Sequence, residues 1–498
     1  MQFETQAKKN RIQFDPNSTP GYALNMTSMT NDVTLSQRSA PTLASNFGLY
    51  YQQLLTTGDD TPFISSSPNS GGRINISIAE NRLNFPTLRT KMSECTLQTA
   101  DVEISQYGPD NGLPKLRTAI AKHLSHLLGN IKETFTDDNS NTKQEGYTVL
   151  PESIVVTQGV TSALDALAHV LSNSNDVWLT PAPFYVSYTR DLKTRANVDI
   201  WPIYPSNTTN NFSILPTISD FELAYNRCLS KNRRVTTVLI CNPSNPTGCC
   251  YTATTLTNIL TWCANRNLSV VVDEIFAATT INNSFTSVLT LPLGSKPNVA
   301  VLWGCAKEFG LGGWHLGCVH STSILLRQAL CRVVHLNNAS NPIQHQLAGV
   351  LEDRAFIKSY RESNLVILNR GIKTVITACT ALGFDYVPVS AGLFVFINLN
   401  SLMKECSWAN ERALFRHIFK ECNVVMSPGE GSLATPGWFR CCYACAPNGA
   451  VVEAFHRIGK VRKEDVVVSE EDRIGARVTE DLLKYFNEDA GGGNKVKL

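Results

Sequence analysis

Short apolar segments bounded by turn-forming residues recur through the middle of the chain, and each has the length of a buried β-strand. Helical periodicity separates several of them: Leu164, Leu167, Ala168 and Leu171 recur at i, i+3, i+4 and i+7. Strands that are apolar on both faces and alternate with helices predict an α/β fold with a mostly parallel sheet between helices. The seven predicted strands are SIVVTQG (153–159), DVWLT (176–180), VDIWPIY (198–204), TTVLICN (236–242), LSVVVDE (268–274), VAVLWG (299–304) and LGCVHS (316–321).

The ends of the chain differ in character from its middle. Residues 1–40 are rich in Ser, Thr and Asn and are expected to form a disordered N-terminal arm, and residues 481–498 are expected to be a flexible tail. The alternating strands and helices occupy residues 96–345, interpreted as a large domain. In folds of this kind ligands bind at the carboxyl ends of the strands, so polar residues there are the first candidates for a functional site.

Composition narrows the class of protein. The 498 residues carry 44 Lys+Arg and 42 Asp+Glu, and this balance argues against nucleic acid or an anionic membrane as a partner. No apolar run long enough to span a bilayer is expected, and the N-terminus lacks the apolar core of a signal peptide. Fifteen cysteines are then best interpreted as reduced thiols of a cytoplasmic protein. The stretch CCYAC (441–445) lacks a partner pair at zinc spacing, so no metal site is predicted.

Three polar residues follow predicted strands. Asp273 comes directly after three valines, so its carboxylate needs a cation or a hydrogen-bond donor, although a helix-capping aspartate has the same pattern. Asn245 lies in the rigid turn NPSNPTG, which aims its amide above the sheet. Lys307 precedes the glycine-rich stretch GLGGWHLG, where either a ligand comes close to the backbone or a plain surface loop is present.

A phosphate seat is predicted nearby. Gly159 precedes a helix whose first free N–H groups include those of Val160 and Thr161, although a simple Thr or Ser cap is a common alternative. A lysine, an acid, an amide and a phosphate seat at strand ends have one economical joint explanation, pyridoxal 5'-phosphate. The lysine would form a Schiff base with it, the aspartate would keep its pyridine nitrogen protonated, and the asparagine would donate to its phenolic oxygen.

Several motifs carry a resemblance to a known family. In order and rough spacing from about residue 70 to about 446, the chain resembles fold-type I pyridoxal-phosphate enzymes of the class I/II aminotransferase family. It is most similar to their 1-aminocyclopropane-1-carboxylate (ACC) synthase branch. The matching stretches are IAENRLNF, YGPDNGLPKLRTAIAKHL, TPAPFYVSYTRDL, NPSNPTG, VVDEIF, the lysine segment and MSPGEGSLATPGWFR.

The resemblance assigns further residues. It supports the roles given above to the lysine, the aspartate and the asparagine. Tyr185 matches the aromatic residue that stacks on the cofactor ring, with Phe184 as the neighbouring candidate. Arg440 matches the arginine that binds the substrate α-carboxylate, and Glu80 matches an acid of the substrate pocket in the synthase branch. A solvated loop acid is the alternative for Glu80.

The chain also departs from the family pattern. His315 stands where an arginine that binds the phosphate is expected, and Gly304 replaces a serine that helps to bind it. Phe276 replaces a tyrosine that donates to the phenolic oxygen, and Asp110 aligns with a tyrosine contributed by the partner subunit. Each lost charged hydrogen bond weakens cofactor binding by about 1.5–3 kcal/mol. His315 is nevertheless assigned to the phosphate site.

The resemblance implies a two-domain homodimer and an enzyme. A smaller α+β domain would combine residues 41–95 and 346–480. The expected reaction acts on an L-α-amino acid through an aldimine, with Lys307 taking the Cα proton as general base. The products would be those of an aminotransferase or an ACC synthase-like lyase, in amino-acid biosynthesis or specialised metabolism.

Two other functions are compatible with the same fold, and a third is disfavoured by the sequence. A carbon–sulfur lyase of the same family shares the first steps of the reaction. A non-catalytic pseudoenzyme on the same fold is the second alternative. A nicotinamide dehydrogenase is disfavoured, because GLGGWHLG lacks the G-x-G-x-x-G spacing and its strand-then-helix context.

Overall fold

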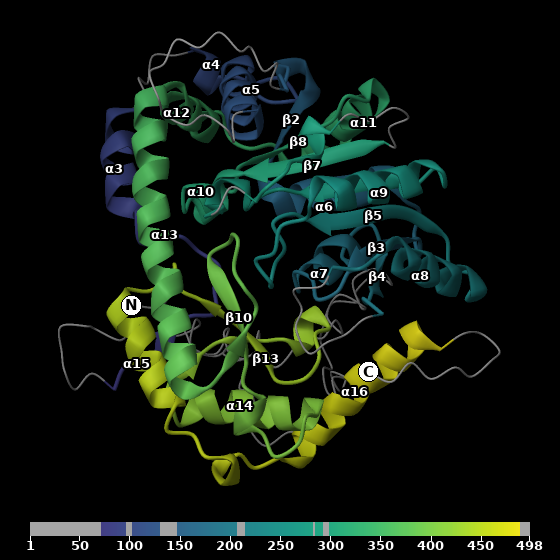
Figure 1. Cartoon of the computed structure of the whole chain (residues 1–498). Coiled ribbons are helices and arrows are strands. Elements are labelled where there is room, and N and C mark those ends of the chain that lie inside the picture. Colours follow the sequence, from purple (N-terminus) through teal and green to yellow (C-terminus); the bar gives the residue numbers. More distant parts are fainter. Residues whose placement is uncertain are drawn as a thin grey trace, which may run out of the picture.

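The structure, a computed structural model, describes residues 71–95, 102–129, 147–206, 215–281, 284–291 and 298–488 (Figure 1). The predicted arm, residues 1–40, and the first thirty residues of the predicted small domain lie outside the described residues. Two bodies of structure are seen in Figure 1, a layered body with the large sheet above and a second body below it.

All seven predicted strands form one sheet, in the order β2-β8-β7-β6-β5-β3-β4. Strands β3 to β7 pair in parallel with one another, and β8 runs antiparallel between β2 and β7. The prediction of a mostly parallel seven-stranded sheet is confirmed. The strands are β2 (Ile154–Thr157), β3 (Val177–Pro181), β4 (Asp199–Ile203), β5 (Val235–Cys241), β6 (Ser269–Asp273), β7 (Val299–Gly304) and β8 (Gly317–His320).

Both faces of this sheet are covered. Successive residues are buried along β2, β3 and β8, although successive side chains point to opposite faces. Within β6, Val270, Val271 and Val272 are all fully buried, which explains why such strands appear in the sequence as continuous apolar runs. The associated helices are α5 (Pro114–Gly129), α6 (Gly159–Leu171), α7 (Tyr188–Lys193), α8 (Ile218–Ser230), α9 (Ala253–Ala264), α11 (Ile324–Val334) and α12 (Asn341–Glu352).

The second body joins segments from both sides of the large sheet in the sequence. Strand β1 (Ile74–Asn75) pairs in parallel with β11 (Val424–Val425), so residues before the large sheet are tied to residues far beyond it. A four-stranded antiparallel sheet has the order β12-β13-β10-β9. Other elements of this second body are α3 (Phe85–Glu94), β9 (Asp385–Tyr386), β10 (Phe394–Asn398), α14 (Trp408–Lys420), β12 (Ser427–Pro428), β13 (Trp438–Cys442) and α15 (Asn448–Ile458).

A long helix, α13 (Arg354–Leu382), runs along one side of the molecule and spans both bodies (Figure 1). Among the described helices it alone is long and apolar enough to cross a membrane by length and composition, whereas the sequence analysis expects no such run. Its buried residues include Leu368, Val375 and Cys379, and the helix packs against α15 and β10. The core helix of a globular protein has the same composition.

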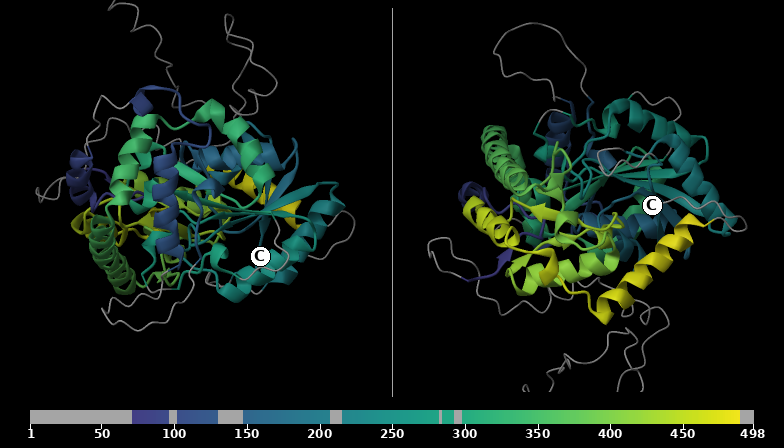
Figure 2. Two further views of the ribbon diagram at one scale, coloured as in Figure 1. Left: turned by 90° about the horizontal axis from the view of Figure 1, so that it is seen from above. Right: turned by 60° about the horizontal axis from the view of Figure 1, so that its bottom comes forward.

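The C-terminal helix, α16 (Glu470–Asn487), corrects the predicted tail. The chain is helical beyond residue 481, where the sequence predicts flexibility. The cause is apolar packing: Leu483 and Phe486 are buried, and the ring of Phe486 lies 5.0 Å from that of Trp201 in β4. Figure 2 shows α16 crossing from the helices of the second body to the side of the large sheet.

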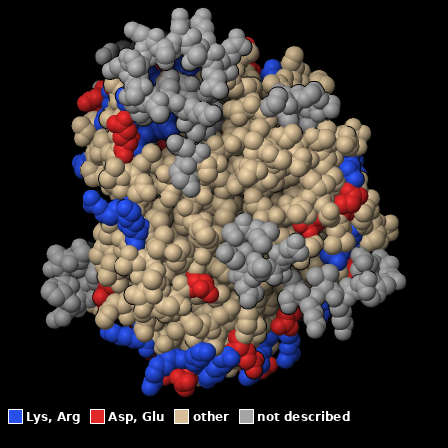
Figure 3. All heavy atoms as spheres, viewed as in Figure 1, with Lys and Arg blue, Asp and Glu red and all other residues tan. Residues whose placement is uncertain are grey.

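Charged side chains are scattered over the face drawn in Figure 3, with lysines, arginines and acids close together along its lower rim. Neutral residues cover most of the area between. This interleaving of the two signs agrees with a net charge of +2 for the whole chain.

Candidate active site

Three candidate residues come from the carboxyl ends of neighbouring strands. Asp273 is the last residue of β6, Asn245 follows β5, and Lys307 lies in the short helix α10 (Cys305–Glu308) directly after β7. Strand β6 pairs in parallel with both β5 and β7, so all three residues emerge at the same edge of the sheet. The topology thus brings together residues that are up to 62 positions apart in the sequence.

Asp273 is a buried acid whose two oxygens are both bonded. It is 4% exposed. The hydroxyl of Tyr188 donates to Oδ2 over 2.7 Å, and the backbone N–H of Ile275 donates to Oδ1 over 3.2 Å. Burial raises the pKa of Asp273, while these hydrogen bonds and the charge of Lys307 oppose the rise. The surroundings therefore supply the hydrogen-bond donors that a buried carboxylate at this position requires.

Lys307 is held by a loop from the second body. Its Nζ donates to the carbonyl oxygen of Ala79 over 2.9 Å. Burial first, and then the charge of Arg440, lower the pKa of the Lys307 amine. A lysine whose pKa is lowered in this way is more readily available as an uncharged nucleophile and base.

Arg440 is a buried cation in β13, only 8% exposed. Its Nη1 donates to Asn245 Oδ1 over 2.8 Å, and its Nη2 donates to the carbonyl of Ser77 over 2.7 Å. Its Cζ lies 5.2 Å from the centre of the Phe394 ring. The buried Nε has no partner within the described part of the chain, so the guanidinium keeps donor capacity for an anionic ligand.

The start of α6 presents backbone donors to its surroundings. Gly159 has φ of +79°, and the side chain of the N-cap residue, Gln158, makes no capping hydrogen bond. Val160 is half-buried and Thr161 is exposed. The hydroxyl of Ser162 is buried without a partner in the described residues. Uncapped N–H groups at a helix start form a seat for an anion.

His315 lies beside this helix start. A β-carbon on Gly159 would meet the backbone of His315 at 3.7 Å. His315 adopts left-handed backbone geometry, with φ of +48°, and its side chain is exposed. The structure thus brings this histidine to the predicted phosphate seat, from the segment that follows the lysine.

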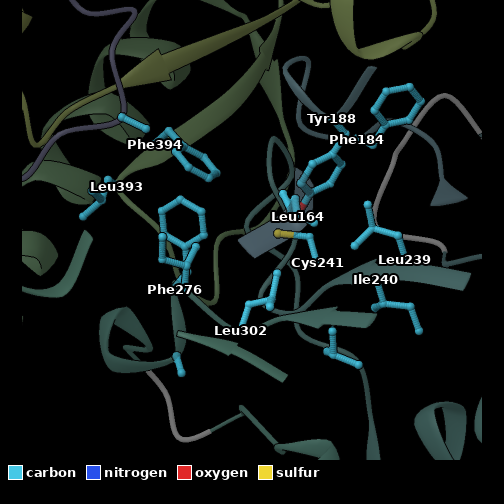
Figure 4. Packing of buried hydrophobic residues seen from close by; sticks show 14 of the residues in the cluster. Leu164, Phe184, Tyr188, Leu239, Ile240, Cys241, Phe276, Leu302, Leu393 and Phe394 are labelled. Atoms are coloured by element: carbon cyan, nitrogen blue, oxygen red, sulfur yellow. The ribbon is translucent and has the colours of Figure 1, made fainter. Parts of the chain in front are cut away.

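The other departures from the family pattern have structural counterparts. A β-carbon on Gly304 would lie 3.2 Å from Val160 and 3.3 Å from the carbonyl of Leu316, so the space beside the helix start is already filled. Phe276 is buried and packs edge-to-face on Phe394, with ring centres 5.3 Å apart (Figure 4). Asp110 accepts a hydrogen bond from His335 Nδ1 over 2.8 Å.

Two predicted residues lie at the margin of this group. Glu80 forms an ion pair with Arg82 at 2.5 Å, and its side chain is 38% exposed. Its charge nevertheless acts on the amine of Lys307. Tyr185 is half-buried, and its ring meets that of Tyr188 edge-on with centres 5.3 Å apart.

Sequence reasoning missed Tyr188, Ser77 and Ser162. Tyr188 bonds Asp273, and the Ser77 carbonyl bonds Arg440, across separations of 85 and 363 residues. Tyr188 lies in TPAPFYVSYTRDL, one of the stretches that match the family, but nothing in that stretch marks its bond to Asp273.

Comparisons with known proteins decide the family. The sequence model described as Aminotransferase class I and II matches residues 73–458. The chain belongs to this family. Among curated relatives, 1-aminocyclopropane-1-carboxylate synthase 7 of Arabidopsis thaliana is 30% identical over 421 residues, which cover 81% of this chain and 92% of that protein. Synthase 11 of the same plant is 30% identical over 414 residues, covering 80% and 86%.

Solved structures support the fold. A single mutant of Thermus thermophilus aspartate aminotransferase superposes with a TM-score of 0.69 at 18% identity, over 86% of this chain and all of that one. An aromatic aminotransferase from Pyrococcus horikoshii gives 0.66 at 21% identity, over 80% and 96%. The prediction of a fold-type I enzyme near the ACC synthase branch is confirmed, and the chain is a pyridoxal-phosphate-dependent transferase or lyase.

The residues present fit this cofactor. A lysine of lowered pKa, a buried acid and an uncapped helix start lie at one sheet edge, and these are the groups that an aldehyde, a pyridine nitrogen and a phosphate require. The unpartnered Nε of Arg440 and hydroxyl of Ser162 are buried polar atoms of the kind that a ligand completes.

Proposed function

We propose that this enzyme binds an L-α-amino acid by its carboxylate and removes the proton from its Cα. The observation that carries the proposal is the placement of Lys307 and Arg440. Burial and the neighbouring guanidinium keep the pKa of the amine low, while the guanidinium retains an unpartnered N–H for a carboxylate. An enzyme of this class needs both a base and a carboxylate clamp.

Each candidate residue has a place in this proposal. Asp273 would hold the ring nitrogen of pyridoxal phosphate, Asn245 its phenolic oxygen and Tyr185 its face. The N–H groups of Val160 and Thr161, together with His315, would hold the phosphate. When bound, the cofactor supplies a ring that accepts electrons from the bond broken at the substrate Cα.

The chain supplies the remaining functions. Arg440 orients the substrate, Lys307 takes the Cα proton as general base, and Glu80 borders the substrate pocket. Because the curated relatives are ACC synthases, we favour a lyase of that type or an aminotransferase, acting in biosynthesis or specialised metabolism. We also propose a homodimer. A cytoplasmic location stays a prediction.

Product analysis separates the possible reactions. Purified enzyme with pyridoxal phosphate is incubated with a panel of amino acids and S-substituted amino acids, with and without a keto-acid acceptor, and products are identified by mass spectrometry. A requirement for the acceptor indicates transamination. Release of a keto acid with a thiol or ammonia indicates elimination, including carbon–sulfur cleavage, and a cyclopropane product indicates the synthase reaction.

A spectroscopic control tests for a pseudoenzyme. The wild type should turn yellow with the cofactor, Lys307→Ala should lose this absorbance, and Lys460→Ala, which removes an exposed lysine, should keep it. Equal absorption of the wild type and Lys307→Ala would favour the pseudoenzyme instead.

A further inference from the structure

Tyr188 places a hydroxyl in an otherwise apolar position. The residue begins α7 and is fully buried, and Figure 4 shows its ring near Leu164 and Cys241. Its ring packs edge-on against Tyr185, a contact that phenylalanine could make as well. The hydroxyl donates a hydrogen bond to Asp273 Oδ2 over 2.7 Å. A buried hydroxyl is costly unless such a bond compensates for its lost hydration.

This bond acts on both the orientation and the charge of the acid. Tyr188 fixes Oδ2 and the Ile275 N–H fixes Oδ1, so the carboxylate plane is held from two sides. A donated hydrogen bond favours the ionised form, against the burial that favours the neutral form. The other titratable groups that interact with this pair include the amine of Lys307, the thiol of Cys241 and the carboxyl of Glu274. Tyr188 is thus the neutral side-chain donor that keeps this acid usable as an anion.

We propose that Tyr188 is a positioning residue, which holds Asp273 ionised and correctly oriented for the pyridine nitrogen of the cofactor. The inference rests on the proposed role of Asp273. Removal of the hydroxyl should weaken cofactor binding about tenfold, because a hydrogen bond to a charged group contributes at least about 1.5 kcal/mol. The effect should depend on the ring nitrogen itself.

A cofactor analogue makes this dependence measurable. In 1-deazapyridoxal 5'-phosphate a C–H replaces the ring nitrogen while the aldehyde and phosphate remain. Dissociation constants of both compounds are measured by equilibrium dialysis for the wild type, Tyr188→Phe, Asp273→Asn and the control Tyr251→Phe, which removes another buried hydroxyl. Thermal unfolding of each cofactor-free protein verifies that it is folded.

The expected result is a selective loss. Tyr188→Phe should bind pyridoxal phosphate about tenfold more weakly than the wild type does. It should bind the deaza analogue as the wild type does, and Tyr251→Phe should match the wild type for both compounds. Equal weakening toward both compounds, or no weakening, would overturn the inference. Failure of the proposed function gives a different pattern, in which the wild type does not discriminate between the two compounds and Asp273→Asn has no effect.

Discussion

The carbonyl oxygen of Asn81 lies against Gly310, only 2.1 Å from where a β-carbon on that glycine would stand. Gly310 also has φ of +68°, which side chains disfavour. The close approach that the glycine-rich stretch indicates is thus made at this position by the protein's own loop. The same loop carries Ala79, which bonds the amine of Lys307.

This contact predicts that Gly310→Ala is strongly destabilising. The added methyl group would displace the loop, and the alanine backbone would be strained at this positive φ. We expect a loss of at least about 2 kcal/mol in the free energy of unfolding. Gly313→Ala is the matched control, since no atom of the described residues beyond its own chain neighbours lies within 4 Å of its β-carbon position. Urea unfolding of both variants checks the prediction, and equal effects at the two glycines would contradict it.

Arg440→Lys should impair substrate binding. Lysine keeps the charge but loses the planar fork that bonds Asn245 and the Ser77 carbonyl and that, in the proposed function, binds the substrate carboxylate. One lost charged hydrogen bond corresponds to roughly a 10- to 150-fold rise in KM. Steady-state kinetics with the substrate found by product analysis measures it, with the exposed Arg473→Lys as control. An unchanged KM would remove Arg440 from the carboxylate site.

The buried acid Glu274 should make the stability of the folded protein depend on pH. Burial raises its pKa to about 8, although Ser287 and the N–H of Val288 donate to its carboxylate. Between its unfolded pKa, about 4.5, and its folded pKa, the folded state holds a proton that the unfolded state has released. Glu274 therefore makes the folded protein less stable as pH rises through this window, by up to about 1.4 kcal/mol per pH unit.

Glu274→Gln removes this titration. The melting temperature of the variant, relative to that of the wild type, should therefore rise from pH 5 to pH 8. The exposed Glu480→Gln should show no such trend. Thermal unfolding across the pH range measures both differences, and a constant offset for Glu274→Gln would refute the assignment.

A buried ion pair stands next to the catalytic candidate. His123 Nε2 lies 3.1 Å from Glu308 Oε2, and both side chains are 1% exposed. Trp303 Nε1 also donates to this oxygen. Burial would raise the pKa of Glu308, but the interactions with His123, together with the charge of Arg361 and the hydrogen bond from Trp303, hold this pKa below its usual range. The pair and the indole therefore anchor the residue that follows Lys307.

Removal of one partner should be costly. His123→Ala should lower the free energy of unfolding by about 3 kcal/mol, because the buried carboxylate loses its imidazole partner and keeps only the indole donor of Trp303. Combined with Glu308→Gln, the double-mutant cycle should give a coupling of about 2–3 kcal/mol, at the upper end of the values for residues in contact. The exposed pair of Lys115 and Glu352, 3.6 Å apart, provides the reference and should contribute no more than about 1 kcal/mol. Equal couplings for the two pairs would contradict the role given to burial.

The large sheet could be predicted from sequence because strands buried on both faces appear as short runs of β-branched residues, such as Val270 to Val272, bounded by turn formers. The two-residue strands β1, β9, β11 and β12 could not be predicted, since their pairing depends on distant segments rather than on local pattern. The acid, amide and lysine were accessible because strand ends mark them. The bond from Tyr188 was not, because a tyrosine near a helix start resembles any core aromatic residue.

The same distinction explains the errors at the helices. The prediction of a flexible tail did not account for the burial of Leu483 and Phe486. Their spacing fits a helix, but Phe486 packs on Trp201, almost three hundred positions earlier in the sequence. Helix α13 contains Arg370 and Lys373 within its apolar C-terminal half, and these two charges interrupt the run of apolar residues in the sequence.

Helix α16 is fastened at both of its ends. Near its start, Asp472 forms an ion pair with Arg416 of α14, and near its end Phe486 packs on Trp201 of the large sheet. A rotation of one body away from the other must therefore bend this helix or separate those two rings. Because α13 runs continuously past both bodies on the opposite side, the two helices together restrain such a rotation from two sides of the molecule.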